Sequence, residues 1–346
     1  MAFQQWLRDQ LEIVDKCPIC DSEKSRVLQS GLIDRMTDPS TGFWEICACE
    51  NCGVAYLSPR PDRESIGNAY SHYYTHNSDK DDLVNNRLRL IKSYFSEKYY
   101  AVACKKGRFS DYVVYIAMRL FVPLSLYFDA KSRHLFKGEK GTGKLLDVGC
   151  GNGEFLRFAD RYGWSVVGVD FDEDAVTEAR SGDLDVRTGG IDTIGSKEKF
   201  DFISLSHVIE HVYDPVELIR TCYALLNDGG TLWLETPNIE SIGYALYKSN
   251  WRGLEPPRHI MLFNQKSLRS ILTKTGFVSV EQENHGLSGV YMGLASERLL
   301  NQSKPCVSML DCGMRKIGMF LKVLSLELIQ LSSKKRREFL TLVAIR

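Results

Sequence analysis

The stretch Leu145–Gly153, which reads LLDVGCGNG, decides the fold of this chain. An apolar run leads into an acidic residue and three glycines at alternate positions, and a helical pattern starts at Glu154. Glycine accepts positive φ angles and lets the backbone come close to a ligand. A strand, a glycine turn and a helix in this order are the first unit of a nucleotide-binding α/β sheet.

The spacing of the glycines distinguishes between two kinds of ligand that such a loop can bind. A dinucleotide fingerprint is GxGxxG, with a pyrophosphate on the helix N-terminus. Here the third glycine comes one residue earlier, and Glu154 stands where the last glycine would fall. Asp147 would repel a pyrophosphate, whereas S-adenosylmethionine carries an ammonium, a sulfonium and no phosphate. The loop therefore favours S-adenosylmethionine, and a tight turn without a ligand is the alternative.

Composition excludes several classes of protein. The 346 residues allow one large or two moderate domains, and 44 Lys+Arg balance 44 Asp+Glu. Zero net charge argues against an electrostatically driven nucleic-acid binder. No secretory leader is visible, and the apolar runs near 112–128 and 317–331 are interrupted short of a membrane span. Ten cysteines then indicate metal ligands and reduced thiols in a cytoplasmic protein.

Two C-x-x-C knuckles, Cys17/Cys20 and Cys49/Cys52, could supply four thiolates to a tetrahedral zinc. The segment between them looks like short strands, so we expect a zinc ribbon. Its role should be structural, because four thiolates leave zinc no open position and so small a lobe has little core. A small β-hairpin with unmetallated thiols is the alternative, and Cys47 lies outside the knuckle spacing.

The middle of the chain is less informative. Residues Ile66–Tyr74 are aromatic and polar and could form a lid over a ligand or pack between lobes. Residues 82–137 look helical, and for the apolar stretch Phe109–Phe128 we expect buried connecting helices, with a membrane-surface face as the alternative. The run Lys334–Arg337 beside a second apolar helix suits an anionic membrane surface or a lipid-linked substrate, or is a solvated charge run.

From Lys144 the pattern alternates strands and helices, as in a doubly wound parallel α/β sheet. The last strand, 338–345, should return antiparallel at the sheet edge, and residues 287–334 should contain two helices. Three regions are predicted: a zinc-ribbon lobe at 1–62, a helical lid or linker at 63–139, and a ligand-binding domain at 140–346 with a helical insertion at about 287–334.

Ligand-binding residues are expected where the strands end. Asp170, about 20 positions after the glycine loop, could accept hydrogen bonds from ribose hydroxyls. Phe171 could pack on adenine, and Gly190 and Ile191 follow at the expected adenine position.

The strand at 200–205 runs into two histidines. His207 and His211 could share one helical face, but a metal is disfavoured because no third ligand is obvious. Histidine suits proton transfer, because its unperturbed pKa is about 6.5. Glu210 could orient a histidine or cap a helix. The loop Trp251–Phe263 is rich in charged and aromatic groups suited to lining a pocket.

Taken together, the glycine stretch, Asp170, residues 200–211 and Thr236-Pro237-Asn238 resemble the class I S-adenosylmethionine-dependent methyltransferases. The motif Pro257-Arg258-His259 and the ribbon narrow this resemblance to bacterial methyltransferases of sugar and polysaccharide pathways. The resemblance implies a seven-stranded Rossmann-like methyltransferase sheet with an N-terminal zinc ribbon and added helices.

By that resemblance, the methionyl part of S-adenosylmethionine would be surrounded by Asp147, Gly149, Gly151 and Gly153. Ser206 and His207 would flank the sulfonium. Sugar C-methyltransferases use a Glu-His pair after the fifth strand to handle the proton. Arg258-His259 stands there in this chain, which favours O-methylation. Sugar C-methylation and a zinc-ribbon RNA-modifying methyltransferase remain alternatives.

Methyl transfer to a hydroxyl needs a base, and we expect His259 or His211 in that role. Either histidine could instead merely bond backbone or substrate. The expected acceptor is a small molecule, a sugar nucleotide or a lipid-linked glycan, with nucleic acid disfavoured. The expected location is the cytoplasm, with weak association to the inner face of the membrane as an alternative.

Overall fold

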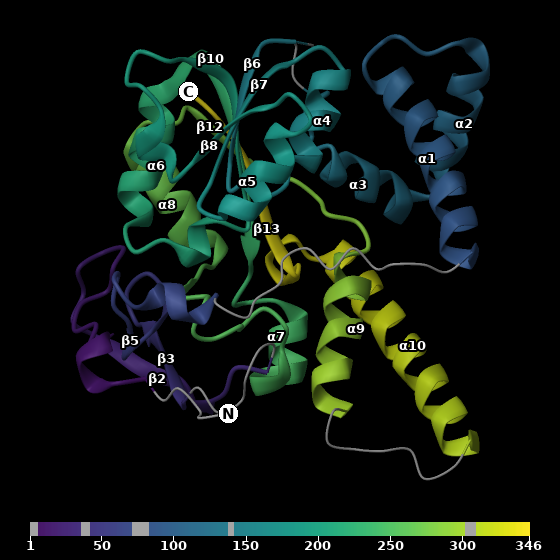
Figure 1. The fold of residues 1–346 in the computed structure, drawn as a ribbon. Coiled ribbons are helices and arrows are strands. Elements are labelled where there is room, and N and C mark those ends of the chain that lie inside the picture. Colours follow the sequence, from purple (N-terminus) through teal and green to yellow (C-terminus); the bar gives the residue numbers. More distant parts are fainter. Residues whose placement is uncertain (1–5, 36–41, 71–82, 138–141, 302–308) are drawn as a thin grey trace.

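The computed structural model describes residues 6–35, 42–70, 83–137, 142–301 and 309–346. A seven-stranded sheet flanked by helices lies above a smaller N-terminal β lobe, and two helical hairpins project from one side (Figure 1). His72, Tyr73 and Tyr74 of the predicted lid lie outside the described residues.

The large sheet has the strand order β12-β13-β10-β9-β6-β7-β8. Its strands in chain order are β6 (Lys144–Val148), β7 (Ser165–Asp170), β8 (Asp185–Thr188), β9 (Phe200–Ser206), β10 (Leu226–Pro237), β12 (Ser279–Gln282) and β13 (Phe339–Ile345). The strands from β8 to β10 are parallel, and the connection reverses direction between β6 and β9. The doubly wound, Rossmann-like prediction is therefore confirmed.

The last strand differs from the prediction in one respect. β13 is antiparallel, as expected, but it pairs with both β10 and β12 and so lies inside the sheet. β12 forms the edge instead. The sequence pattern of a strand contains no information about which neighbours it pairs with, and this placement depends on the rest of the fold.

Both faces of the sheet are covered. Leu145 and Leu146 point to opposite faces, because successive side chains alternate along a strand. On one face lie α4 (Glu154–Arg161) and α5 (Glu173–Arg180), and on the other α6 (Pro215–Leu225) and α8 (Gln265–Thr275). Burial on two sides explains why these strands read as continuous apolar runs.

The sheet of the N-terminal lobe includes one strand from much later in the sequence. Its sheet has the order β11-β4-β3-β2, formed by β2 (Ser25–Leu32), β3 (Trp44–Cys49), β4 (Ala55–Leu57) and β11 (Met261–Leu262). A second small sheet pairs β1 (Leu11–Glu12) with β5 (Arg60–Pro61). Between β10 and β11 lie only a short helix and a 3-10 helix, so the small lobe is hydrogen-bonded to the segment that leaves the large sheet.

The remaining helices are α1 (Leu83–Ala103), α2 (Phe109–Leu120), α3 (Val122–Lys131), α7 (Ile242–Tyr247), α9 (Ser288–Asn301) and α10 (Met309–Ser332). Short 3-10 helices are η1 (Arg8–Gln10), η2 (Ile66–Ala69), η3 (Ile191–Thr193), η4 (Ile209–His211), η5 (Lys248–Asn250) and η6 (Lys334–Arg336). The two helices expected within 287–334 are α9 and α10.

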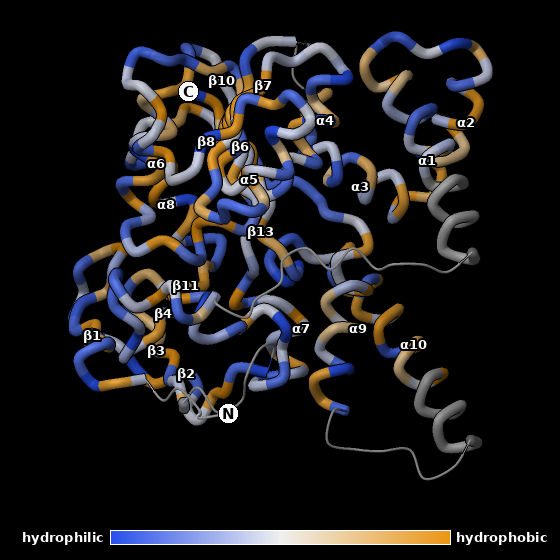
Figure 2. The backbone as a smooth tube through the Cα atoms, viewed as in Figure 1, coloured by the Kyte–Doolittle hydropathy of each residue, from blue (hydrophilic) through white to orange (hydrophobic). Residues whose placement is uncertain are grey.

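The expectation of fully buried helices between 109 and 128 is wrong for α2. Phe109, Ile116 and Leu120 are exposed, and apolar residues run along the outside of this helix (Figure 2). Taken singly, none of the described helices has the length and apolar character of a membrane span. α2 and α3 reach that measure only as a pair, and they are bent by 112°.

Candidate cofactor and acceptor site

The glycine loop after β6 needs glycine at each predicted position. Gly149, Gly151 and Gly153 have φ angles of 72°, 52° and 81°, which L side chains rarely adopt. A Cβ on Gly149 would also lie 2.6 Å from Cγ2 of Val208. The Gly151 N–H donates to Oδ2 of Asp170 at 2.7 Å, so the loop closes onto the end of β7.

Asp147 is completely buried beneath this loop. Its Oδ1 accepts a hydrogen bond from Oγ of Ser204 at 2.8 Å and another from the Arg133 guanidinium. Its Oδ2 is buried and has no partner among the described residues. Burial raises the pKa of Asp147, although the charge of Arg133 opposes the shift. The site thus presents an unused acceptor next to the glycine loop.

Arg133 was not found from the sequence. It follows α3, its backbone has a φ of 50°, and its guanidinium lies 3.9 Å from the ring centre of Phe155. No spacing rule links an arginine in a helical linker to an aspartate on a later strand. Only the fold brings the two side chains together.

The predicted ribose and adenine residues gather beside the loop. Asp170 ends β7, and its Oδ1 also accepts from the N–H of Asp172 at 2.9 Å. The Phe171 ring is exposed and lies close to Gly190, where an added Cβ would approach Cζ of Phe171 to 3.0 Å. Ile191 begins η3 directly after Gly190. These residues form one open edge next to the glycine turn.

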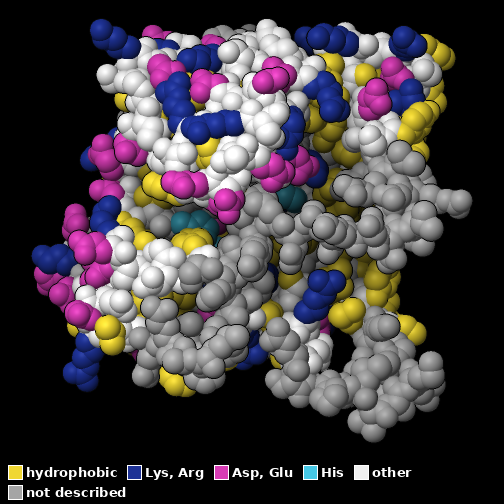
Figure 3. All heavy atoms as spheres, in the orientation of Figure 1, with side chains coloured by type: hydrophobic (Ala, Val, Ile, Leu, Met, Phe, Trp, Pro, Cys, Tyr) yellow, Lys and Arg dark blue, Asp and Glu magenta, His cyan; other side chains and the backbone are white. Residues whose placement is uncertain are grey.

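Histidines and buried carboxylates meet beyond the carboxyl ends of β9 and β10. They are His207, His211, His259 and His285 with Glu210, Glu235 and Glu255. Histidine side chains are visible in a recess between the large sheet and the N-terminal lobe (Figure 3). The composition of this recess, more than any single motif, distinguishes it from the rest of the described surface.

The prediction that His207 and His211 could share one helical face is wrong. Ser206 ends β9, and His207 follows with a φ of 53°, so the backbone turns before η4 begins at Ile209. The turn directs Nδ1 of His207 toward Oε1 of Glu210 at 3.1 Å.

Glu210 orients its neighbours rather than capping a helix. Its Oε2 accepts a hydrogen bond from Thr236 at 2.9 Å, and the side chain is fully buried. Burial alone would raise the pKa of Glu210, but the hydrogen bond from His207 and the nearby histidines lower it to about 2. Burial alone would lower the pKa of His207, but Glu210 and Glu235 reverse this and raise it.

His211 and His259 lie edge to face, with ring centres 4.8 Å apart. Nδ1 of His259 lies 2.8 Å from the Gly253 carbonyl, so this nitrogen must donate and Nε2 keeps its lone pair. Burial lowers the pKa of His259 to about 4. Nδ1 of His211 lies 3.0 Å from the Arg258 carbonyl. Ligand atoms of Glu210, His211 and His259 lie within 4.8 Å of one another; this group differs from the His207–His211 pair considered in the sequence, because it does not include His207.

Arg258, which precedes His259, has a structural role. Its guanidinium is fully buried and bonds both carboxylate oxygens of Asp34 at 2.7 and 2.9 Å. It also donates to Oε1 of Glu255 at 3.1 Å and to the Ala69 carbonyl at 3.1 Å. Arg258 therefore fastens the His259 loop to the N-terminal lobe.

The four knuckle cysteines form one cluster. Sγ atoms of Cys17 and Cys52 lie 3.5 Å apart, those of Cys20 and Cys49 lie 3.6 Å apart, and all four fall within 4.8 Å of one another. A tetrahedron with Zn–S bonds of about 2.3 Å has S···S edges of about 3.8 Å. The cluster fits a closed zinc site, and Cys47 is not part of it.

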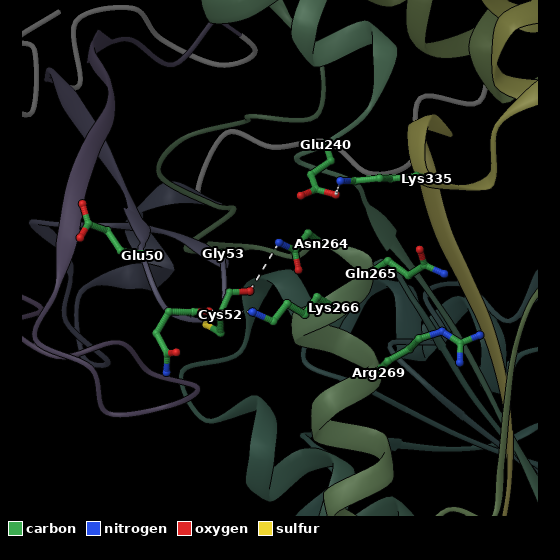
Figure 4. A pocket seen from close by; sticks show the side chains of 10 residues that line it. Glu50, Cys52, Gly53, Glu240, Asn264, Gln265, Lys266, Arg269 and Lys335 are labelled. Atoms are coloured by element: carbon green, nitrogen blue, oxygen red, sulfur yellow. Dashed lines mark hydrogen bonds and ion pairs between the residues drawn. The ribbon is translucent and has the colours of Figure 1, made fainter.

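A cavity of about 590 Å³ lies elsewhere, between the second knuckle and the start of α8 (Figure 4). Asn264 spans it by donating to the Cys52 carbonyl at 3.5 Å. The lining contains none of the predicted cofactor or catalytic residues, so we do not assign methyl transfer to this cavity.

Comparison with known proteins finds similarity to methyltransferases. A family model described as a methyltransferase domain matches residues 119–282. The ubiquinone biosynthesis O-methyltransferase of Xanthomonas campestris pv. campestris (strain B100) is 34% identical over 111 residues, which cover 30% of this chain and 46% of that protein. The protein of the same name from Xanthomonas axonopodis pv. citri is 33% identical over 116 residues, or 31% and 48%. The chain spans about half the length of the curated relatives it matches.

Solved structures resemble the chain more distantly. An S-adenosylmethionine-dependent methyltransferase from Archaeoglobus fulgidus is 22% identical, with a TM-score of 0.43 over 63% of this chain and 92% of that one. Phosphoethanolamine N-methyltransferase 2 of Haemonchus contortus is 20% identical, with a TM-score of 0.43 over 63% and 52%. The matched residues 119–282 contain Arg133, the glycine loop, Asp170 and the histidines at 207, 211 and 259.

Proposed function

We propose that the chain is an S-adenosylmethionine-dependent methyltransferase that methylates an oxygen of a small-molecule acceptor, and its similarity to a methyltransferase family model over residues 119–282 supports this proposal. The observation that carries the cofactor part of this proposal is the buried, unpaired Oδ2 of Asp147 beside the glycine loop, with Arg133 next to it. An ammonium would satisfy the carboxylate, and Arg133 could pair with the carboxylate of the same amino-acid group. A pyrophosphate would leave Asp147 facing a like charge.

Different residues of the chain would bind different parts of the cofactor. Asp147, Arg133 and the glycines would hold the methionyl part, and Asp170 would accept from the ribose hydroxyls. Phe171, Gly190 and Ile191 would line the adenine, and Ser206 and His207 would flank the sulfonium. When bound, the cofactor supplies a methyl group already activated by that sulfonium, so alignment and removal of a proton are left to the protein.

His259 is the better candidate for the base. The Gly253 carbonyl fixes its tautomer, so Nε2 can accept a proton from the acceptor hydroxyl as the carbon–oxygen bond forms. Buried Glu210 would stabilise the imidazolium that results. His211, in contact with the same ring, is the second candidate.

The grouping of Glu210, His211 and His259 favours one rival mechanism. A divalent cation held there would acidify the hydroxyl as a Lewis acid, and the histidines would be ligands rather than bases. A chelator treatment that metal analysis shows to leave the ribbon zinc in place separates the two: it leaves a histidine-base reaction unchanged and removes a metal-assisted one.

The nature of the acceptor rests on similarity alone. The name of the Xanthomonas relatives supports an oxygen acceptor. The ribbon and the Pro257-Arg258-His259 motif support a sugar-nucleotide or lipid-linked glycan acceptor. A nucleic-acid acceptor is not proposed, because the chain has no net positive charge.

We also propose that Cys17, Cys20, Cys49 and Cys52 hold a structural zinc. Metal analysis of the purified protein should find about one zinc per chain. Cys49→Ser should lose this zinc and Cys47→Ser should keep it. Equal loss from both variants would contradict the assignment.

Calorimetry tests the cofactor. S-adenosylhomocysteine should bind with measurable heat and NAD should not. Asp147→Asn should weaken binding, whereas Asp185→Asn, at the exposed start of β8, should not. Binding of NAD alone, or unchanged affinity in Asp147→Asn, would overturn the proposal.

A further inference from the structure

An unusual apolar surface begins on α2. Phe109, Val113, Ile116 and Leu120 recur at helical spacing and share one face, and Phe109 and Leu120 are 86% and 81% exposed. A connecting helix of a globular domain normally turns such a face inward. α2 packs against α1 with its other side.

A second helix repeats the pattern. On α10, one face consists of the exposed residues Ile317, Phe320, Leu321, Leu324 and Leu328. Figure 2 shows hydrophobic residues on both helices, which lie on the same side of the molecule. Contiguous exposed apolar area of this kind marks a partner or a membrane rather than ordinary surface.

The α2 face ends at an elbow. α2 and α3 are bent by 112°, and the break exposes Leu120, Phe121 and Val122 in succession. The Pro123 carbonyl then packs directly against Gly286, just before α9, so that a Cβ on Gly286 would have no room. Since α9 packs along α10, the contact of Pro123 with Gly286 places the elbow near the start of the α9–α10 hairpin.

The charges beside this surface are mainly positive. Lys105, Lys106 and Arg108 are exposed immediately before α2. The acidic side chains of α2 and α3, Asp111 and Asp129, are neutralised by Lys98 and Arg119. After α10 come the exposed Lys334, Lys335 and Arg336, while Glu327 of α10 is buried.

We propose that this surface, formed by α2, the elbow at Leu120–Val122 and α10, docks onto an anionic lipid bilayer. Apolar helix faces with basic flanks lie in the lipid interface, with cations at the headgroups. A second copy of the chain would bring the same cations together, which costs free energy. The three consecutive apolar residues at the elbow suit a deformable bilayer better than a second helix.

The docked orientation has a consequence for the site. α3 contains 10 residues, about 15 Å of helix, and ends two residues before Arg133. The bilayer would therefore lie close to the cofactor loop. The docking itself does not depend on methyl transfer, because its test measures binding.

The experiment is flotation of the full-length, zinc-loaded protein with two kinds of vesicle. We expect the protein to float with vesicles of phosphatidylcholine and phosphatidylglycerol in equal parts, and to stay below with phosphatidylcholine alone or at high salt. Ile116→Glu and Phe320→Glu should each reduce flotation about tenfold or more, since both place a charge in the apolar interface. Thr177→Glu, on the exposed side of α5, is the matched control and should float like the parent.

Melting temperatures close to that of the parent would show that both variants fold, because the replaced side chains are exposed. Failure of the parent to float with anionic vesicles overturns the proposal. So does flotation that Ile116→Glu and Phe320→Glu leave unchanged. Light scattering that finds a dimer abolished by Ile116→Glu, without vesicle binding, would assign the surface to a second copy instead.

Discussion

At the scale of single residues, the cofactor loop depends on the pairing of Asp147 and Arg133. Arg133→Met would leave the buried carboxylate without its cation, and burial already raises the pKa of Asp147. Loss of one charge-assisted hydrogen bond costs about 1.5–3 kcal/mol, so S-adenosylhomocysteine affinity should fall roughly 10- to 100-fold by calorimetry. Arg161→Met, exposed on α4, is the control. Unchanged affinity for S-adenosylhomocysteine in Arg133→Met would show that Arg133 does not contribute to cofactor binding.

His259 gives a second test at this scale. His259→Ala should keep cofactor affinity and lose turnover by about 10²–10⁴-fold, as removal of a general base does. Burial lowers the pKa of His259 to about 4, so the imidazole is neutral and competent at every pH well above that value. We therefore expect kcat/KM to fall only as the pH approaches 4, not near the ordinary histidine pKa of about 6.5.

The same shift affects stability. The folded state resists protonation of His259, so the unfolded state binds more protons between about pH 6.5 and 4. The free energy of unfolding is therefore highest, as far as His259 is concerned, above about pH 6.5, and it decreases as the pH falls from about 6.5 to about 4.

If the alanine variants of both His259 and His211 turn over within a few-fold of the parent, neither side chain is the base.

At the scale of elements, the loop between η5 and β11 is held by a buried ion pair. Arg258→Met leaves Asp34 and Glu255 buried with one cation fewer, and breaking such a pair costs about 3–5 kcal/mol. Chemical denaturation should show a loss of this size. Lys16→Met, which breaks the exposed Lys16–Glu23 pair, should change stability by less than about 1 kcal/mol. Similar losses from the two variants would show that the buried clamp has no special role.

Local pattern explains how much of these elements could be predicted. β6, α5 and the glycine loop follow from periodicity and glycine chemistry, which act within a few residues. The Arg133–Asp147 contact, the position of β13 and the pairing of β11 with β4 join distant segments, and no local rule encodes them. Burial of α2 was predicted wrongly because apolar composition does not reveal what covers a helix.

At the scale of the whole molecule, the loop that contains Arg258 and His259 links the large sheet to the N-terminal lobe. β11 hydrogen-bonds to β4 of the ribbon lobe, and His259 lies two residues before β11. Arg258 joins the same loop to Asp34 of that lobe. The position of His259 relative to the large sheet therefore depends on the ribbon sheet, although none of the four knuckle cysteines lies at the cofactor loop.

This arrangement predicts that the zinc affects catalysis from a distance. Cys49 ends β3, next to β4, so Cys49→Ser should loosen the ribbon sheet and release β11. The expected result is a lower kcat with nearly unchanged S-adenosylhomocysteine affinity, because Asp147, Arg133 and Asp170 belong to other elements. Cys47→Ser, on the same strand but outside the cluster, should keep both values. Loss of cofactor affinity in parallel with kcat would indicate general unfolding. An unchanged kcat in a zinc-free Cys49→Ser protein would show that the ribbon does not position His259.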